Sequence, residues 1–234
     1  MRNAIVEHLS NDDYLIITND NSGGIGEKEQ DFINVSYDLL SYYAYRVAVV
    51  ECMATRGVPK SILLHNYCGE EHWDKLVSGV KTGLSEIGLD YVPINGSSES
   101  NYHLKQSAIG LVLIARSKAP NIRIPSLEPD YQFAVIGEPL VGQEVTEYKE
   151  QIAPLSVIQT ISTLEKVYMW PVGSKGILTE LNQMIGSDVK QIESKLDLLK
   201  SAGPSTCVII AYPSRHTKEI KKLSKDLFYP LNIS

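Results

Sequence analysis

The chain has 234 residues, of which 43% are hydrophobic and 21% charged, and its formal net charge is −6 at pH 7. This acidic balance argues against a broad nucleic-acid surface, because phosphate backbones need an excess of Lys and Arg. No apolar run approaches the roughly 18 residues that span a membrane, the N-terminus lacks the pattern of a signal peptide, and the three cysteines lie far apart, so we expect a reduced, cytoplasmic globular protein.

Strand and helix patterns alternate through the first half of the chain. Ser36 suits a helix N-cap, and Gly57-Val58-Pro59 suits a helix end. In chain order, we predict strands at 4–8 and 14–18, a helix at 36–56, a strand at 61–64, a helix from about 70 to Gly88, and strands at 91–94 and 106–117.

Residues 118–129 contain three prolines and no periodicity, which predicts a linker between domains 1–120 and 121–234. Val189, Ile192, Leu196 and Leu199 keep helical spacing and predict one of the helices in the second half. We expect strands at 131–136 and 206–212, and helices near 174–185, 188–201 and 217–227. Both halves are therefore predicted to be mixed α/β.

The stretch "TNDNSGGIGEKEQD" follows an apolar run and combines an acid with clustered glycines. Gly23, Gly24 and Gly26 would let backbone N–H groups approach a ligand, while Asp20 could ligate Mg²⁺ and Lys28 could meet a phosphate. The spacing is neither that of a P-loop nor that of a dinucleotide fingerprint. An ordinary hairpin or surface loop explains the local sequence equally well.

Two further polar stretches could contribute to the same chemistry. In "VVECMATRG", Glu51 leans toward the buried side of its helix, where a carboxylate needs a partner such as a metal or an arginine. The stretch "PINGSSESN" follows a strand and could bind a phosphate, hydroxyl or metal, although it also suits a simple polar turn. Its candidate residues are Asn95, Gly96, Ser97, Ser98 and Glu99.

The stretch "LHNYCGEEHW" contains His65, Cys68 and His72, which are residue types that bind zinc. Their spacing lacks a fourth partner and matches known zinc sites poorly. A strand end, a turn and a helix start explain this stretch better.

The order of these pieces resembles the N-terminal domain of the aminoimidazole ribonucleotide synthetase-like superfamily, which includes thiamine-monophosphate kinase and selenophosphate synthetase. "NDNSGGIGEK" is similar to the first nucleotide segment, "ECMATRGVP" to the helix end and "NGSSES" to the third segment. Two acids are displaced: Cys52 stands at one family acid position with Glu51 beside it, and Ser97 stands at another with Glu99 two residues later. Within the superfamily, "SGGIGEKEQD", "VAVVECMA" and "LHNYCGEE" most resemble the α-ribazole kinases of cobalamin salvage.

The resemblance implies a two-domain α/β fold whose N-terminal mixed sheet pairs with a second chain in a homodimer, with a short α/β C-terminal domain. It implies an ATP- and Mg²⁺-dependent kinase that phosphorylates α-ribazole, a nucleoside, on its ribose 5′-hydroxyl. The alternatives are a non-catalytic nucleotide-binding protein or a kinase of another acceptor, such as thiamine monophosphate. The acceptor would lie near residues 173–176, although these also suit an ordinary helix start.

The same resemblance assigns roles to individual residues. Asp20, Glu51 and Glu99 would hold Mg²⁺, the glycine stretch would supply backbone N–H groups, and Lys28 would add positive charge. Asp31 is a candidate ligand or general base.

Overall fold

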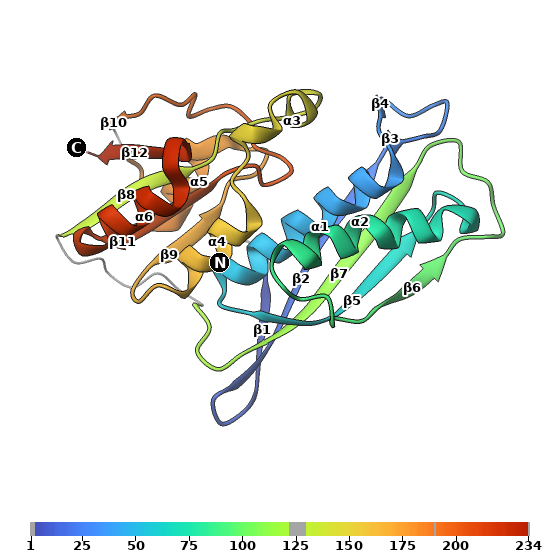
Figure 1. Cartoon of the computed structure of the whole chain (residues 1–234), viewed down its shortest axis with the longest axis horizontal. Coiled ribbons are helices and arrows are strands. Elements are labelled where there is room, and N and C mark those ends of the chain that lie inside the picture. Colours follow the sequence, from blue (N-terminus) through green and yellow to red (C-terminus); the bar gives the residue numbers. More distant parts are fainter. Residues whose placement is uncertain (1–2, 122–129, 190, 234) are drawn as a thin grey trace. The chain divides into compact units, whose positions relative to one another are not determined.

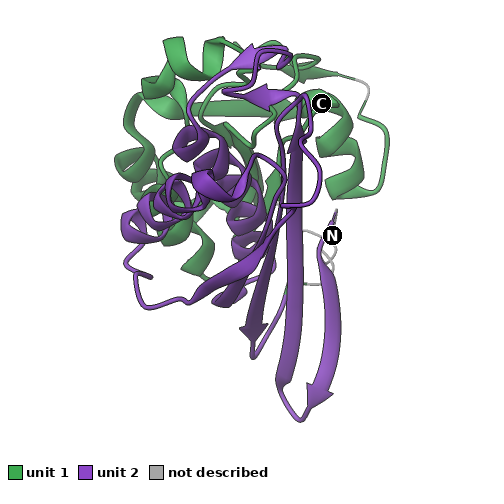
Figure 2. Cartoon of the chain, turned by 90° about the vertical axis from the view of Figure 1, so that its right-hand side faces the viewer, with its two compact units in different colours: residues 1–2, 121–234 green, residues 3–120 purple. Residues whose placement is uncertain are grey.

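The computed structural model describes residues 3–121, 130–189 and 191–233. The chain divides into two compact units, residues 3–120 and 121–234, the latter grouped with the first two residues (Figure 2). Each unit is described by itself. Most of the predicted linker, residues 122–129, lies outside the described residues.

The unit of residues 3–120 is built on a five-stranded mixed sheet with the strand order β1-β2-β7-β5-β6. Neighbouring strands are antiparallel except β5 and β6, which are parallel. The sheet strands are β1 (Ile5–Ser10), β2 (Asp13–Gly23), β5 (Val58–Asn66), β6 (Ile94–Ser98) and β7 (Ala108–Ser117). The remaining elements are α1 (Tyr37–Ala54), α2 (Trp73–Glu86), a 3-10 turn at Glu70–His72, and the short parallel pair β3 (Ile25–Gly26) and β4 (Ile33–Asn34).

These pairings bring several chain segments to one edge of the sheet. Because β2 and β5 are both antiparallel to β7, and β6 is parallel to β5, the carboxyl ends of β2, β5 and β6 lie beside the start of β7. Helix α1 begins at this edge, since the hydroxyl of Tyr37, its first residue, lies 3.0 Å from the Ser107 Oγ. His72, just before α2, contacts the Tyr37 ring in a tilted arrangement with centroids 4.6 Å apart. Both helix N-termini therefore share this edge.

Helices α1 and α2 lie side by side on one face of the sheet (Figure 1). Thr18 of β2 points toward α1 and donates a hydrogen bond from Oγ1 to the Ala48 carbonyl at 2.8 Å. Gly79 and Gly83 of α2 let the helices approach closely. A Cβ at Gly79 would lie 1.9 Å from the Asp38 carbonyl oxygen, and one at Gly83 would lie 2.3 Å from the Tyr45 ring. This contact fixes α1 against both the sheet and α2.

The predicted alternation of strands and helices in this unit is confirmed, with two corrections near the polar stretches. Strand β2 continues to Gly23, so Asp20 pairs with Leu111 inside the sheet instead of ending the strand. Strand β6 runs through Asn95 and Gly96, which we expected to form a turn. A Cβ at Gly96 would lie 1.8 Å from the Leu64 carbonyl oxygen, so a glycine there permits close packing of β6 on β5.

The unit of residues 121–234 contains a second five-stranded sheet with the order β10-β12-β8-β11-β9 and only antiparallel neighbours. Every residue of the interior strand β11, which lies between β8 and β9, is buried. Helix α5 packs on one face through Ile177, Leu181 and Met184. The strands are β8 (Tyr131–Ile136), β9 (Tyr168–Pro171), β10 (Ile192–Glu193), β11 (Val208–Pro213) and β12 (Phe228–Ile233); the α-helices are α3 (Glu144–Glu147), α4 (Leu155–Thr163), α5 (Gly176–Ile185) and α6 (Thr217–Ser224).

The predicted helix at 188–201 is wrong. Its described residues form the short strand β10, which pairs with β12, and an irregular stretch. Two polar side chains stabilise the irregular path: the Ser194 hydroxyl accepts the Leu196 N–H, and Asp197 accepts the Leu199 N–H. Such local bonds compete with helical ones. The predictions of β8, β11, α5 and α6 are confirmed, whereas α4, β9 and β12 were missed.

Candidate functional site

The glycine segment, residues 23–34, forms a loop at the sheet edge where β2 ends. Its short strands β3 and β4 pair in parallel, so the chain between them loops round and then runs beside β3 in the same direction. The Gly24 N–H donates to the Ser107 carbonyl at 2.8 Å, and the Phe32 N–H donates to the Gly24 carbonyl at 2.7 Å. Gly24 has a φ of +70°, which favours glycine. The segment is thus an ordered loop, and its Gly24 N–H is already bonded within the protein.

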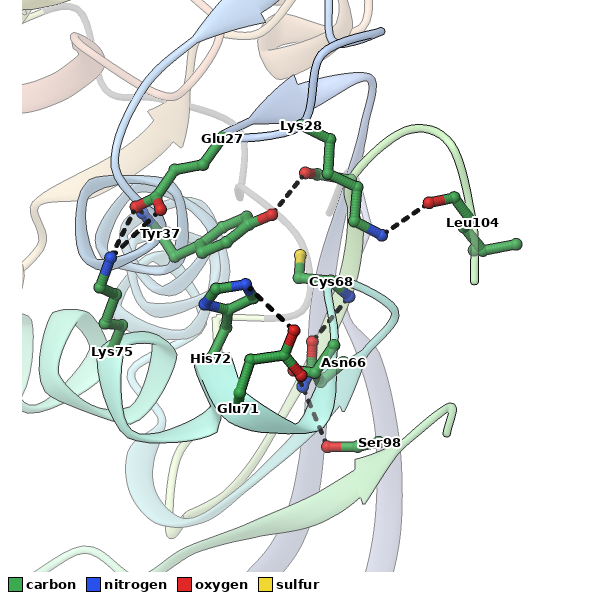
Figure 3. Close-up of polar contacts among 12 residues, drawn as sticks. Glu27, Lys28, Tyr37, Asn66, Cys68, Glu71, His72, Lys75, Ser98 and Leu104 are labelled. Carbon is green, nitrogen blue, oxygen red and sulfur yellow. Dashed lines mark hydrogen bonds and ion pairs between the residues drawn. The ribbon is translucent and has the colours of Figure 1, made fainter. Parts of the chain in front are cut away.

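Lys28 holds this loop to two other segments. Its ammonium group donates to the backbone carbonyls of Tyr67 and Leu104, both at 3.0 Å, and of Gln106 at 3.5 Å (Figure 3 shows the contact with Leu104). Since an ammonium group has three hydrogens, these carbonyls account for its donors. In this conformation the predicted phosphate contact of Lys28 is replaced by contacts within the protein.

Asp31 holds the same loop to Ser107. Its Oδ1 accepts the Ser107 N–H at 2.7 Å, and its Oδ2 accepts the Ser107 hydroxyl at 2.7 Å and the Lys28 N–H at 2.9 Å. Burial works to raise the pKa of Asp31, but these hydrogen bonds and the Lys28 charge outweigh it and leave the pKa below its ordinary value. The structure therefore gives this carboxylate an anchoring role, and a lowered pKa makes it a poor general base.

Tyr37 contacts both Ser107 and the glycine segment at this edge of the sheet. Its side chain is 1% exposed, and its hydroxyl is within hydrogen-bond distance of the Ser107 Oγ that also contacts Asp31. A Cβ at Gly26 would lie 2.8 Å from the Tyr37 ring and 2.5 Å from the Ser107 Oγ, so the loop packs closely on both. Gly26 therefore serves close packing in this structure.

Glu27 lies at the N-terminus of α1. Its Oε1 accepts the Tyr37 N–H at 3.1 Å, and its carboxylate forms an ion pair with Lys75 of α2 at 3.1 Å (Figure 3). Burial acts to raise the pKa of Glu27, but the Tyr37 N–H and Lys75 lower it below the ordinary value. Ser36, the predicted N-cap, makes no side-chain cap, so Glu27 supplies one.

Asn66 joins the ends of β5 and β6. Its side-chain amide donates to the Ser98 Oγ at 2.9 Å and to the Gly69 carbonyl at 2.7 Å, while its oxygen accepts the Cys68 N–H at 2.8 Å (Figure 3). Ser98 is thereby placed at the same edge as the loop that contains Cys68. The nearby predicted residues Asn95, Gly96 and Ser97 are exposed along β6.

Asp20 lies three residues before the end of β2, on the face toward α1. Desolvation raises the pKa of Asp20 to about 7, although a hydrogen bond from the Asn21 backbone acts in the opposite direction. A half-buried carboxylate with so little compensation would be stabilised by a cation. Mg²⁺ is commonly held by one or two carboxylates together with phosphate oxygens, so Asp20 fits one such ligand.

The three predicted metal ligands do not come together within one chain. Glu51 is buried and follows Tyr37 by fourteen residues in α1, which is about 21 Å along the helix away from the glycine segment. Glu99 follows β6, which two strands separate from β2, or about 14 Å. Its Oε1 accepts the Asn101 N–H at 2.7 Å.

No group of three or more His, Cys, Asp or Glu side chains among residues 3–121, 130–189 and 191–233 is placed to hold a metal ion. The set of Asp20, Glu51 and Glu99 was inferred from motif order, which does not report how far apart β2, α1 and β6 place their side chains. Residues 65–72 form the end of β5, a turn and the 3-10 turn that leads into α2, as predicted for this stretch.

Local sequence did not indicate four residues that make contacts at this edge: Ser107, Tyr37, Asn66 and Lys75. Ser107 stands directly before a long apolar strand, but its importance depends on β7 pairing beside β2, which local sequence does not reveal. Tyr37 and Lys75 resemble ordinary helix residues until α1 and α2 are placed together.

In the other unit, the start of α5 near residues 173–176 is covered by the chain itself. The Leu178 N–H donates to the Leu198 carbonyl at 2.9 Å, and the Ala202 N–H donates to the Gly173 carbonyl at 3.1 Å. A Cβ at Gly176 would lie 2.7 Å from the Leu199 carbonyl group. This favours the interpretation of the glycines here as a helix start over that of an acceptor site.

No model of a known protein family matches the chain, and no curated protein sequence matches it. Its structure is similar to thiamine monophosphate kinase from Aquifex aeolicus, with a TM-score of 0.67 and 11% identity over 100% of this chain and 89% of that one. It is also similar to AaThiL complexed with AMPPCP and TMP (TM-score 0.62, 11% identity, 98% and 83% covered). A third similar structure is E. coli HypE, a hydrogenase maturation protein (TM-score 0.61, 13% identity, 92% and 79% covered).

These similarities confirm the predicted fold class. The chain has the aminoimidazole ribonucleotide synthetase-like fold, with a mixed sheet in the first unit and a second α/β unit. Within the described parts of the chain, no helix combines the length and apolarity needed to cross a membrane.

Proposed function

We propose that the protein is an ATP- and Mg²⁺-dependent phosphotransferase that phosphorylates a small alcohol, with α-ribazole as the first candidate and α-ribazole 5′-phosphate as its product. The observation that carries the proposal is the position of Asp20. This half-buried carboxylate, with a pKa raised to about 7, lies on the strand that leads into the glycine segment. The fold shared with thiamine monophosphate kinase supports the same reaction class.

Phosphoryl transfer depends mainly on positioning and charge neutralisation, and both needs agree with this edge of the sheet. Asp20 would hold the metal, and Mg²⁺, when bound, would neutralise negative charge on the phosphates. The glycine segment, the exposed residues Asn95 and Ser97, and the partly buried Ser98 would line the nucleotide side. The unit of residues 121–234 would supply the acceptor side.

We also propose a homodimer formed through the sheet of residues 3–120. On the face opposite α1 and α2, Ile17 lies directly opposite Ile114, and Leu63 lies opposite Val112. Leu63 is 37% exposed, and Ile5, which pairs with Ile17, is 53% exposed. An apolar sheet face of this kind suits burial against a second copy. Glu51, which is buried in α1, and Glu99, which follows β6, are not part of the metal site that we propose within one chain.

Light scattering tests the dimer. Ile17→Glu should convert a species of two chains into one chain, because a charge in an apolar interface is expensive. Tyr91→Glu, at an exposed position after α2, is the matched control and should keep the mass of two chains. A single-chain mass for the unsubstituted protein would contradict the dimer.

The reaction is tested by measuring ADP formation from Mg-ATP with and without α-ribazole. Asp20→Asn should reduce turnover by about a hundredfold or more, since it removes the carboxylate while keeping the shape, whereas Asp12→Asn in the exposed β1–β2 turn should not. ATP binding without turnover would favour a non-catalytic nucleotide-binding protein. Turnover with thiamine monophosphate instead would favour the acceptor named for the similar kinases.

A further inference from the structure

The glycine segment is anchored by two opposite charges at the ends of one tight turn. Lys28 begins the turn and Asp31 ends it, and the Asp31 N–H donates to the Lys28 carbonyl at 3.0 Å. The cation sits among three carbonyl oxygens, and the anion accepts three N–H or O–H donors. Each charge therefore meets groups of the complementary polarity.

Both anchors converge on the residues that precede β7. Lys28 contacts the carbonyls of Leu104 and Gln106, and Asp31 contacts Ser107. The Gln106 side chain adds a hydrogen bond of 2.7 Å from Nε2 to the Gln30 carbonyl. Residues 28–31 are thus fastened at several points to residues 104–107.

Apolar burial contributes little to holding this turn. Phe32, the large apolar residue that follows it, is 87% exposed, and Leu104 is 42% exposed. The position of the turn therefore depends mainly on hydrogen bonds to charged groups, which are stronger than those between neutral groups. Loss of either charge should free the loop without disturbing the core.

We propose that Lys28 and Asp31 are positioning residues that together latch residues 28–31 onto residues 104–107 and so fix the glycine segment before a ligand arrives. The Lys28 ammonium group acts on the protein's own carbonyls instead of on a phosphate. Where the proposed phosphotransferase function holds, on which this part of the inference rests, the latch pre-organises the segment for nucleotide.

Hydrogen exchange of residues 24–35 in the protein without nucleotide tests the latch and does not depend on any activity. Lys28→Met and Ser107→Ala should each speed exchange in this peptide by about tenfold or more, because the segment then opens more often. Lys60→Met, at the exposed far end of β5, is the matched control and should leave that exchange unchanged. The double variant should exchange little faster than either single one, because both changes open the same latch.

Chemical rescue distinguishes a positioning charge from a structural side chain. In Lys28→Ala, added methylammonium should restore slow exchange by occupying the three carbonyls, whereas the larger tetramethylammonium, which has no N–H donor, should not. If ADP formation is measurable, the latch variants should raise the KM for Mg-ATP more than they lower kcat.

Unchanged exchange in both Lys28→Met and Ser107→Ala would overturn the latch. So would a raised KM for Mg-ATP in Lys28→Met with exchange still slow, since Lys28 would then contact the phosphates directly. Faster exchange in a protein that never turns over ATP would support the latch while refuting the proposed phosphotransferase.

Discussion

Two irregular segments each cover the start of a helix, but they are held in different ways. Residues 194–202 cover α5 with backbone groups, through the Leu198 carbonyl and the Ala202 N–H, and Leu196 and Leu198 pack partly buried against the core. The glycine segment covers α1 with the Glu27 side chain and is fastened by Lys28 and Asp31. Its Phe32 stays exposed.

The difference separates a cover that is held by packing on the core from one that is held by charged side chains. Backbone hydrogen bonds combined with partly buried leucines that pack on the core are lost only when that packing opens. Charged side chains on a solvated loop can exchange their partners for water, ions or a ligand at smaller cost. We therefore expect the glycine segment, and not residues 194–202, to open when its charged contacts are screened or removed.

The largest expected effect comes from adding a methyl group where each segment meets its neighbours. Gly176→Ala would bring a Cβ within 2.7 Å of the Leu199 backbone at a φ of +76°, so we expect a loss of about 2–4 kcal/mol in the free energy of unfolding. Gly26→Ala meets the Ser107 and Tyr37 side chains and should cost slightly less. Gly23→Ala, with no atom within 4 Å, is the control and should change denaturant unfolding by less than ~0.5 kcal/mol.

The next effect is the pH dependence that Asp20 contributes beside the glycine segment. Its folded-state pKa of about 7 lies above the ordinary value of 3.8, so between these pH values the folded chain holds a proton that the unfolded chain releases. Stability from this group should therefore fall as pH rises from about 4 to about 7, by roughly 1–4 kcal/mol. Asp20→Asn should remove that slope in denaturant unfolding; an unchanged slope would show that Asp20 is charged at neutral pH.

A smaller effect should appear when salt is raised. Screening weakens exposed charges, so 1 M NaCl should speed exchange in the glycine segment by a few-fold. The amides of Leu178 and Ala202, which are bonded to backbone carbonyls, should exchange at the same rate as before. Equal acceleration of both sets would contradict the distinction between the two segments.

The smallest effect concerns the ion pair between Glu27 and Lys75. Their side chains are 30% and 56% exposed, so the pair is well solvated. Glu27→Gln should lower the free energy of unfolding by about 0.2–1 kcal/mol, measured by denaturant titration against the exposed control Glu29→Gln. A loss much above that range would mean that Glu27 carries more of the loop's anchoring than Lys28 and Asp31.

Local sequence patterns predicted the two helices and the long strands of the first unit because each has a clear period and a clear end, whereas β3 and β4 were missed and β6 begins where the predicted strand at 91–94 ends. Leu40, Val50 and Ala54 mark α1 by their spacing, and Gly88 marks the end of α2. The same reasoning failed at residues 188–201, where apolar spacing suggested a helix but Ser194 and Asp197 bond the backbone locally and β12 captures β10.

The site was predicted in its segments but only partly in its contacts. Of the three segments that the motif order brought together, the glycine segment and the stretch at Ser98 both contact the turn after β5, through the contacts of Lys28 with Tyr67 and of Asn66 with Ser98. The contacts depend on pairing between distant strands, which brings Ser107 within hydrogen-bond distance of Asp31. They also depend on the direction of α1, which places Glu51 near the end of the helix farthest from the glycine segment. Motif order reports neither strand register nor helix direction.

The glycines at 79 and 83 have a mechanical consequence for this edge. With α2 seated against the α1 backbone, α1 has little freedom to slide or rotate, and Tyr37 at its first turn is held still. A displacement of the glycine segment would therefore be limited to the dozen residues before Tyr37. It would not change the position of α1 or of the opposite face of the sheet.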